Sequence, residues 1–298
     1  MTKYTTNSRT VMEATGLIFK MKRLARAIKD AGVFSASVRG CVFGSLIAGQ
    51  IVLPVAAVAL PLPVLSSNGL TDGAAVIDTE SSTTAINITQ NSERIAIEWS
   101  SFDIDENYAV NFLEQATSDV AINNVLLSSG TASNIAGNIN ANGHVVLVNP
   151  NGIVFTSTAQ IDVGGIIASG LSLDEGALGG FIDGNDNTLQ FLNDVDGSAA
   201  YVNNEGVIRA SSIALIGNKI TNSGLIINSP TMVAHNVMSI SATFTYLGAG
   251  DVAEITFGND NLSFEVTMKE GVTADLPGFA ILNSGKIYSK QVILNANI

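Results

Sequence analysis

The chain has few of the residue types that build catalytic or metal sites. Its 298 residues include one cysteine and two histidines. The histidines, His144 and His235, lie far apart, each among apolar residues, whereas a metal or catalytic site needs convergent ligands. No Ser/His/Asp order, phosphate loop or nucleophile elbow is present either. We therefore interpret both histidines as turn or surface residues and predict no metal, no cofactor and no enzymatic activity.

The single cysteine, Cys41, stands before a long apolar run. A lipid-modified cysteine follows such a run, so this position excludes lipidation there. After removal of the N-terminal part, the chain would contain no cysteine. Extracellular compartments normally favour disulfides, and a chain without them is free to cross a second membrane unfolded.

Charged residues are also scarce, at 13%, and their signs are separated along the chain. Residues 1–60 hold 8 Lys and Arg against 2 Asp and Glu, whereas residues 61–298 hold 6 against 24. An acidic body with a net charge of −18 repels nucleic acid and anionic membranes, so we exclude nucleic acid as a partner.

The basic N-terminal part precedes an uncharged apolar run from Cys41 to about Leu65. This order is typical of an export signal, and residues 57–59 offer a small-x-small cleavage site. We predict an extended signal peptide at 1–59 and a Ser, Asp and Gly-rich linker at 60–82. The run of about 25 residues is long enough to span a membrane, so a membrane-anchored surface protein stays open. Three prolines in or near the run argue against a long stable helix: Pro54, Pro61 and Pro63.

Two acidic clusters could carry chemistry. Asp183, Asp186 and Asn187 resemble part of a calcium loop but lack its bidentate glutamate, so we interpret them as a solvated loop. A carboxylate pair could also serve glycoside chemistry on a β-helix, which keeps a polysaccharide-acting enzyme as an alternative. The candidate cluster for that chemistry is Asp103, Asp105 and Glu106.

Short alternating apolar pairs dominate the acidic body. Residues 142–155 read as strand, turn and strand, with the turn at Asn149–Gly152, where Asn and Gly tolerate positive φ and Pro fixes φ. Apolar pairs recur at a constant step, at positions 145/147, 153/155 and 161/163, and three such steps fit one coil. This spacing favours a solenoid.

An Asn-x-Gly-x-Ile phrase begins at Asn204, Asn222 and Asn283. The step from Asn204 to Asn222 predicts a parallel β-helix in which Ile208 stacks on Ile226. The further pairs that this step predicts are Ile213 with Thr231, Leu215 with Val233, and Ile220 with Met238. A β-sandwich with Asn-Gly hairpins is the alternative. Early strands in residues 84–115 are expected to cap the first coil, because an open solenoid end exposes backbone and core.

Strict alternation around the polar turn Gly258–Asn261 predicts a β-hairpin outside the helix, formed by residues 255–268. Residues 181–192 are expected to form a similar excursion. The predicted fold class is therefore all-β: a right-handed parallel β-helix with an N-terminal cap and extra-helical β-hairpins.

The motifs of residues 83–298 resemble the N-terminal two-partner secretion domain of filamentous haemagglutinin-type exoproteins, also called the haemagglutination activity domain. The resemblance implies that this range is one secretion domain and that its turn is the secretion motif. The secretion-motif residues are Asn149, Pro150, Asn151, Gly152 and Ile153. The other family-motif residues are Trp99, Phe102, Gln115, Gly137, Asn142, Gly143, Gly164 and Gly165.

The resemblance also implies a function and partners. It makes the chain the secretion-targeting and folding-nucleating domain of an adhesin-like exoprotein. The implied route crosses the inner-membrane export machinery and the periplasm of a Gram-negative bacterium. It ends at an outer-membrane β-barrel transporter with periplasmic docking domains, and then at the cell surface or medium, with host or cell-surface ligands as targets. Exoproteins of this family are much longer than this chain, so a truncated product or a fragment is expected.

Overall fold

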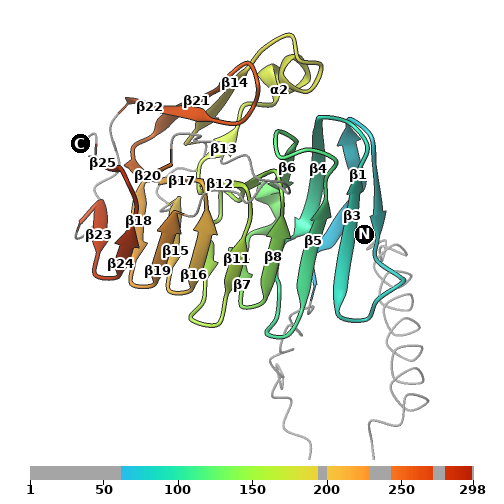
Figure 1. Cartoon of the computed structure of the whole chain (residues 1–298), viewed down its shortest axis with the longest axis horizontal. Helices are drawn as coiled ribbons and strands as arrows, with labels where there is room; N and C mark the ends of the chain where they lie inside the picture. The colour runs from blue at the N-terminus through green and yellow to red at the C-terminus, as the bar shows by residue number, and fades with distance from the viewer. Residues whose placement is uncertain (1–61, 194–199, 229–242, 271–278, 297–298) are drawn as a thin grey trace, which may run out of the picture. The chain divides into compact units, whose positions relative to one another are not determined.

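A computed structural model describes residues 62–193, 200–228, 243–270 and 279–296 (Figure 1). They form short strands that repeat a three-strand coil. The strands up to the middle of the chain are β1 Val64–Asp72, β2 Ala75–Asp78, β3 Ala85–Gln90, β4 Arg94–Ser101, β5 Ala109–Leu113, β6 Val120–Val125, β7 Ser133–Ile135, β8 Asn138–Ala141, β9 His144–Val148, β10 Ile153–Phe155, β11 Gln160–Asp162 and β12 Gly165–Ser169. The later strands are β13 Ser172–Leu173, β14 Thr188–Leu192, β15 Tyr201–Asn204, β16 Val207–Ala210, β17 Ser212–Gly217, β18 Lys219–Asn222, β19 Leu225–Asn228, β20 Phe244–Ala249, β21 Val252–Phe257, β22 Phe264–Glu270, β23 Ile281–Asn283, β24 Lys286–Tyr288 and β25 Val292–Ala296.

Three parallel sheets form the walls of a right-handed β-helix, which confirms the predicted fold. The first sheet has the order β1-β4-β6-β9-β12-β17-β20-β25, and the second has the order β2-β3-β5-β8-β11-β16-β19-β24. The third, with five strands, runs β23-β18-β15-β10-β7. Successive coils therefore stack strand on strand, as the arrows of Figure 1 show.

The N-terminal end of the helix is closed by a cap, as expected, but β1 and β2 form it rather than the predicted strands of residues 84–115, which belong to the first coils. β1 pairs antiparallel with β4, and β2 pairs antiparallel with β3, whereas the coils that follow pair in parallel. The segment predicted as a linker, 60–82, thus contains two strands of the fold. Its Ser and Gly residues lie within or between cap strands, because an antiparallel cap needs tight turns, and one of these glycines, Gly73, has φ 81°. The predicted signal peptide lies outside the described residues.

The register predicted from the Asn204–Asn222 step is confirmed over two of the three walls. Ile208 pairs with Ile226, and Asn204 donates a hydrogen bond to the Asn222 side chain at 2.8 Å. On the first sheet the predicted register is wrong, because Leu215 pairs with Leu247, well beyond the predicted partner. Three predicted partners, Thr231, Val233 and Met238, lie outside the described residues.

The other predicted stacking also needs correction. Ile220 pairs with Ile281, and Ile213 with Thr245. The coil length is not constant either: the step from Ala121 to its partner Val145 is longer than the step from Val145 to its next partner, Ile166. Corners of different length therefore connect walls that stay in register.

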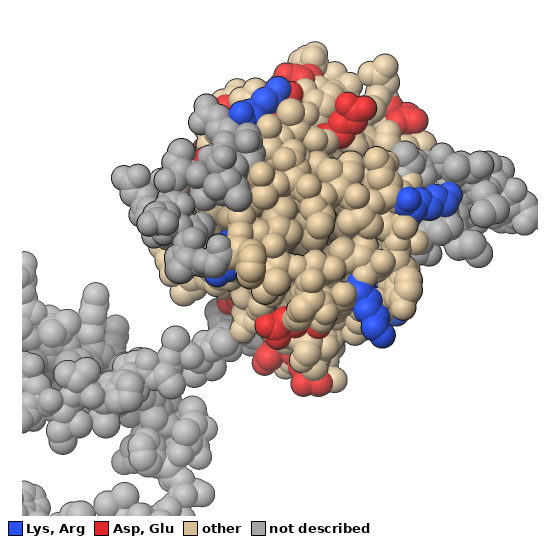
Figure 2. Space-filling view, turned by 90° about the vertical axis from the view of Figure 1, so that its left-hand side faces the viewer, with Lys and Arg blue, Asp and Glu red and all other residues tan. Residues whose placement is uncertain are grey.

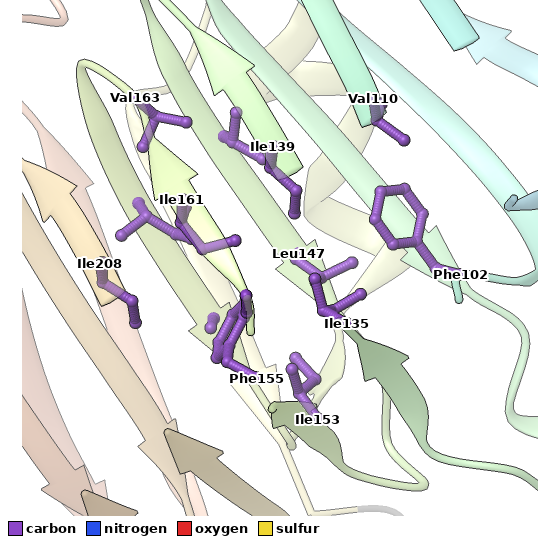
Figure 3. Packing of buried hydrophobic residues seen from close by; sticks show 14 of the residues in the cluster. Phe102, Val110, Ile135, Ile139, Leu147, Ile153, Phe155, Ile161, Val163 and Ile208 are labelled. Atoms are coloured by element: carbon purple, nitrogen blue, oxygen red, sulfur yellow. The ribbon is translucent and has the colours of Figure 1, made fainter. Parts of the chain in front are cut away.

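The interior of the helix is a column of apolar side chains from all three walls. Figure 3 shows Ile139, Leu147 and Phe155 pointing toward one another from three successive strands, and all three are fully buried. The regular repeat of apolar pairs thus corresponds to successive walls of one coil, each directing its apolar residues inward.

A second apolar layer lies on the outer face of the first sheet. Residues 172–192 and 252–270 leave the helix and form a separate antiparallel sheet, in the order β13-β14-β21-β22, which we call the extra-helical sheet (Figure 1). The predicted hairpin is β21–β22. The predicted excursion at 181–192 is present as well, but it includes a helix, α2 (Glu175–Ile182), capped by the Asp174 side chain. No helix in the described ranges is long and apolar enough to span a membrane.

The last described coil, β23–β25, leaves apolar side chains exposed. Leu282 and Tyr288, at outward-facing positions of their strands, are 45% and 59% exposed. Leu294 pairs with the buried Leu247 but is 56% exposed, because no further coil of the described residues covers it. Figure 2 views this end, where uncharged residues predominate and the charged ones lie toward the margin.

Candidate secretion-motif site

The Asn-Pro-Asn-Gly turn joins β9 to β10, two successive walls of the helix. The Gly152 amide donates to the Asn149 carbonyl at 2.9 Å, and Gly152 has φ 109°. Neither Asn149 nor Asn151 is among the described residues with positive φ. The asparagines were expected to supply that backbone freedom. Only the glycine does so, and the asparagines act through their side chains.

Asn149 connects the turn to the preceding coil. Its Nδ2 donates to the Thr131 carbonyl at 3.1 Å and to Ser133 Oγ at 3.0 Å, and its Oδ1 accepts the Asn151 amide at 2.9 Å. The side chain is 1% exposed. A buried amide with all of these partners specifies both the turn and its position on the coil below.

Asn151 makes a second set of bonds to the same preceding coil. Its Nδ2 donates to the Leu127 carbonyl at 3.1 Å and to Ser129 Oγ at 3.2 Å. Leu127 and Ser129 belong to a short 3-10 helix, η1 (Leu127–Ser129), that precedes β7. The two asparagines therefore bind consecutive parts of one underlying corner.

The motif is largely hidden in the folded domain. Asn149, Pro150, Gly152 and Ile153 are buried, and Asn151 is half-buried. A partner that reads these side chains must therefore meet the chain before it folds.

Trp99 and Phe102 anchor the first coils. Both are buried, and their rings meet edge to face at 5.2 Å. Trp99 Nε1 donates to Asn123 Oδ1 at 3.1 Å, so the buried indole has a polar partner. Asn123 Nδ2 in turn donates to the Val146 carbonyl at 3.3 Å, one coil further on. The sequence analysis missed the role of Asn123.

The family-motif glycines permit close stacking at the corners. A Cβ at Gly137, Gly143 or Gly164 would collide with a carbonyl oxygen of the preceding coil. A Cβ at Gly165 would instead collide with the imidazole of His144. These positions need glycine because another backbone or ring occupies the space of a side chain.

The comparison with protein families agrees with this geometry. The sequence matches the TPS secretion domain over residues 64–292. The chain belongs to this two-partner secretion family. Its function is that of a secretion domain, and the family is not an enzyme family.

Two named relatives match parts of this chain. A heme/hemopexin-binding protein of Haemophilus influenzae is 29% identical over 236 residues, which are 78% of this chain and 24% of that protein. Another protein of that name and species is 39% identical over 104 residues, 35% of this chain and 10% of that protein. The chain thus spans about a quarter or less of the length of these relatives.

A solved structure supports the fold. The HMW1 secretion domain from Haemophilus influenzae superposes with a TM-score of 0.56 at 25% sequence identity, covering 76% of this chain and 56% of that one. The β-helix is therefore shared between the two secretion domains.

Glu114 is a partly buried acid that the sequence analysis also missed. It accepts a hydrogen bond from the Gly143 amide, and burial raises its pKa to about 8. Nearby, the Gln115 amide donates to Asp119 Oδ2 at 3.0 Å, and Asn142 Nδ2 donates to the Glu114 carbonyl at 3.3 Å. The family-motif residues Gln115 and Asn142 thus flank a corner fixed by two carboxylates.

His144 is not a turn or surface residue. It is 2% exposed and lies edge to face with Phe257 and Phe264 at 5.8 and 6.0 Å. Burial lowers its pKa to about 4, so the imidazole is neutral at neutral pH. The glycine at position 165 makes the room for this ring. His235 lies outside the described residues.

The acidic clusters serve structural roles in the secretion domain. Asp103 Oδ1 accepts the Asn134 amide at 2.8 Å and joins two coils. The Asp186 backbone carbonyl and Asn187 Oδ1 accept hydrogen bonds from Arg94, at 2.8 Å and 2.7 Å. The described part of the chain contains no group of three or more His, Cys, Asp or Glu residues that could hold a metal ion.

Proposed function

We propose that this domain directs export of its chain through an outer-membrane β-barrel transporter in a Gram-negative bacterium. The inner-membrane export machinery would deliver the chain to the periplasm, where docking domains of the transporter bind it. The observation that carries this proposal, beside family membership, is the burial of the Asn149–Ile153 motif. A motif that becomes inaccessible on folding suits recognition of an unfolded chain, followed by release when the chain folds.

The docking step would use main-chain hydrogen bonds, because an extended segment adds readily to an exposed sheet edge. Residues 142–155 contain two strand segments around the motif and are the segment that we expect to dock. On the far side of the membrane, Asn149 and Asn151 bond to the preceding coil, so each new coil forms on the one before it. Folding then propagates from coil to coil outside the cell and opposes movement of the chain back into the periplasm.

The exoprotein as a whole is proposed to be adhesin-like and to be secreted or held at the cell surface. Membership of the two-partner secretion family supports this, and its ligands would be host or cell-surface molecules. The named relatives bind heme or hemopexin, but this chain covers too little of their length to carry that activity over.

The export proposal is tested by producing the chain with and without its cognate transporter. We expect the protein in the medium only when the transporter is present, and trapped in the periplasm otherwise. Equal export in both strains would refute the assignment of the transporter and leave the fold unaffected.

The motif is tested separately with peptides. A peptide of residues 142–155 should bind the purified docking domains, and Asn149→Ile with Asn151→Ile should weaken that binding. A matched full-length control, Ile226→Ala, perturbs the core without touching the motif. If the double variant and this control are exported equally poorly and the peptides bind alike, the motif acts only in folding.

Two further experiments address the alternative functions. A β-helical enzyme would cleave a polysaccharide and lose that activity on substitution of one Asp or Glu, whereas we expect no cleavage. An anchored protein would retain residues 41–65. N-terminal sequencing of the exported chain should instead give a start at Leu60 or later.

A further inference from the structure

Arg94 binds four oxygen atoms from distant parts of the chain. It begins β4 and is 6% exposed. One terminal nitrogen donates to the carbonyls of Phe181 at 2.5 Å and Asp186 at 2.8 Å. The other donates to Asn187 Oδ1 and Asn261 Oδ1, both at 2.7 Å. The guanidinium also lies 4.1 Å from the centre of the Phe181 ring.

The acceptors are all uncharged, yet they suit a guanidinium. Its planar fork directs several donors at once, which an ammonium group cannot do. Burial lowers the pKa of Arg94, while the charges of Glu93 and Asp186 oppose that shift. The arrangement of these acceptors therefore favours an arginine guanidinium over a lysine ammonium group at position 94.

The layer that Arg94 fastens covers a large apolar surface. The outward-facing residues of the first sheet are buried by the extra-helical sheet and α2. These outward residues include Ala96, Val120, Ile122, Val146, Val148, Ile167, Ala214 and Ile216. Two strands from Arg94 on the same sheet, His144 packs against Phe257 and Phe264. Two early strands, β4 and β9, thus hold the same late hairpin.

The partners of Arg94 follow it in the sequence, so these contacts form late when the N-terminal end of the chain emerges first. Arg94 lies in the first parallel coil, but its acceptors, from Phe181 to Asn261, all come much later in the sequence. When the N-terminal end emerges first, the coils around β4 can stack early. The last acceptor, Asn261, arrives only after most of the domain has emerged. Until then, the layer lacks the β21–β22 hairpin, and the outer face of the first sheet is only partly covered.

We propose that Arg94 is a latch: a positioning residue that locks the extra-helical sheet onto the first coils and thereby completes folding of the domain outside the cell. Latch closure completes the cover over the apolar outer face of the first sheet and opposes backward movement of the chain. This inference rests on the proposed export function for its cellular role, whereas its structural part stands independently.

The structural part is tested on purified protein with Arg94→Met, Arg94→Lys and the control Arg209→Met. Within the described part of the chain, the Arg209 guanidinium reaches only Gln160 Oε1, at 3.5 Å. Both Arg94 variants should lower Tm by roughly 10 °C, because four acceptors, two of them in buried hydrogen bonds, lose the guanidinium donors. Hydrogen exchange in residues 252–269 should accelerate roughly 100-fold, while the coil around Ile226 stays protected. Unchanged exchange in the hairpin would overturn the latch.

A milder variant guards against complete unfolding. Asn261 has φ 53°, so Asn261→Gly keeps the backbone conformation and removes one acceptor. It should open the hairpin in the same direction but less than Arg94→Met, and the double variant should be less destabilised than the sum of the two. Additive effects would show that the two residues do not act together and would refute the proposal.

The cellular part is tested by export assays of the same variants. Arg94→Met and Asn261→Gly should reduce the fraction of chain released to the medium, whereas Arg209→Met should not. Normal release of a variant whose hairpin is open in vitro would overturn the role of the latch in export. If wild-type export does not need the transporter, both the proposed export function and the role of Arg94 in export are refuted. The structural role of Arg94 in holding the hairpin is then judged by hydrogen exchange alone.

Discussion

Replacing Asn149 by alanine removes the side chain that ties the motif to the preceding coil. Its amide bonds to the Thr131 carbonyl, to Ser133 Oγ and to the Asn151 amide, at 3.1, 3.0 and 2.9 Å. A net hydrogen bond is worth about 1 kcal/mol, and a buried partner left unsatisfied costs more. We therefore expect Asn149→Ala to lower the free energy of unfolding by about 2–4 kcal/mol, and Tm by about 5–15 °C.

Urea unfolding of the purified domain measures this loss in the free energy of unfolding. An unchanged m-value shows that the wild type and the variant unfold between the same folded and unfolded states. Asn149→Asp should destabilise more, because a carboxylate oxygen would face the Thr131 carbonyl, and part of the loss should return as acid protonates it. The control is Asn91→Ala, whose exposed side-chain amide reaches, among the residues that the structure describes, only the Thr89 carbonyl at 3.5 Å. A loss at Asn149 no larger than at Asn91 would refute the structural role of the turn.

Three further predictions concern the core, the corners and the partly buried acid. Ile226→Ala should cost about 2–5 kcal/mol in chemical denaturation, whereas Leu282→Ala, at a side chain 45% exposed, should cost far less. Gly164→Ala should destabilise the domain in thermal melts, because its Cβ would meet a backbone carbonyl, whereas Gly179→Ala, with nothing within 4 Å, should stabilise it by up to ~1 kcal/mol. The Glu114 pKa is raised from 4.5 to about 8, so the folded state binds the extra proton, and stability should fall as pH rises through that window. Glu114→Gln should remove this slope of at most about 1.4 kcal/mol per pH unit, and an unchanged slope would contradict the assignment.

The sequence pattern correctly predicted strands whose pairing partners lie nearby in the chain or at a repeated sequence separation. The step from Asn204 to Asn222 correctly predicted the stacking of Ile208 on Ile226, because adjacent coils of equal length repeat the same residues. The alternation in 255–268 predicted the β21–β22 hairpin for a similar reason, since a hairpin pairs neighbouring segments. The cap was expected from the need to close the solenoid, but its residues in 60–82 were not recognised.

The failures share a physical cause. Leu215 stacks on Leu247 in a coil that is longer than the step from Asn204 to Asn222, so a repeat of fixed length does not predict this pair. His144 was predicted to be a turn or surface residue, but it lies within β9, and a hairpin from a distant part of the chain covers it.

The sequence by itself determined the strand repeat, the glycine corners, the tight turn and the family, because backbone preferences and apolar alternation act between near neighbours. Tertiary structure alone decided that the first sheet is apolar on both faces, that the motif asparagines bond to the coil below, and that Arg94 joins β4 to Asn261. Such contacts form only when folding brings distant segments together. The identity of one residue does not reveal which distant residue it will contact.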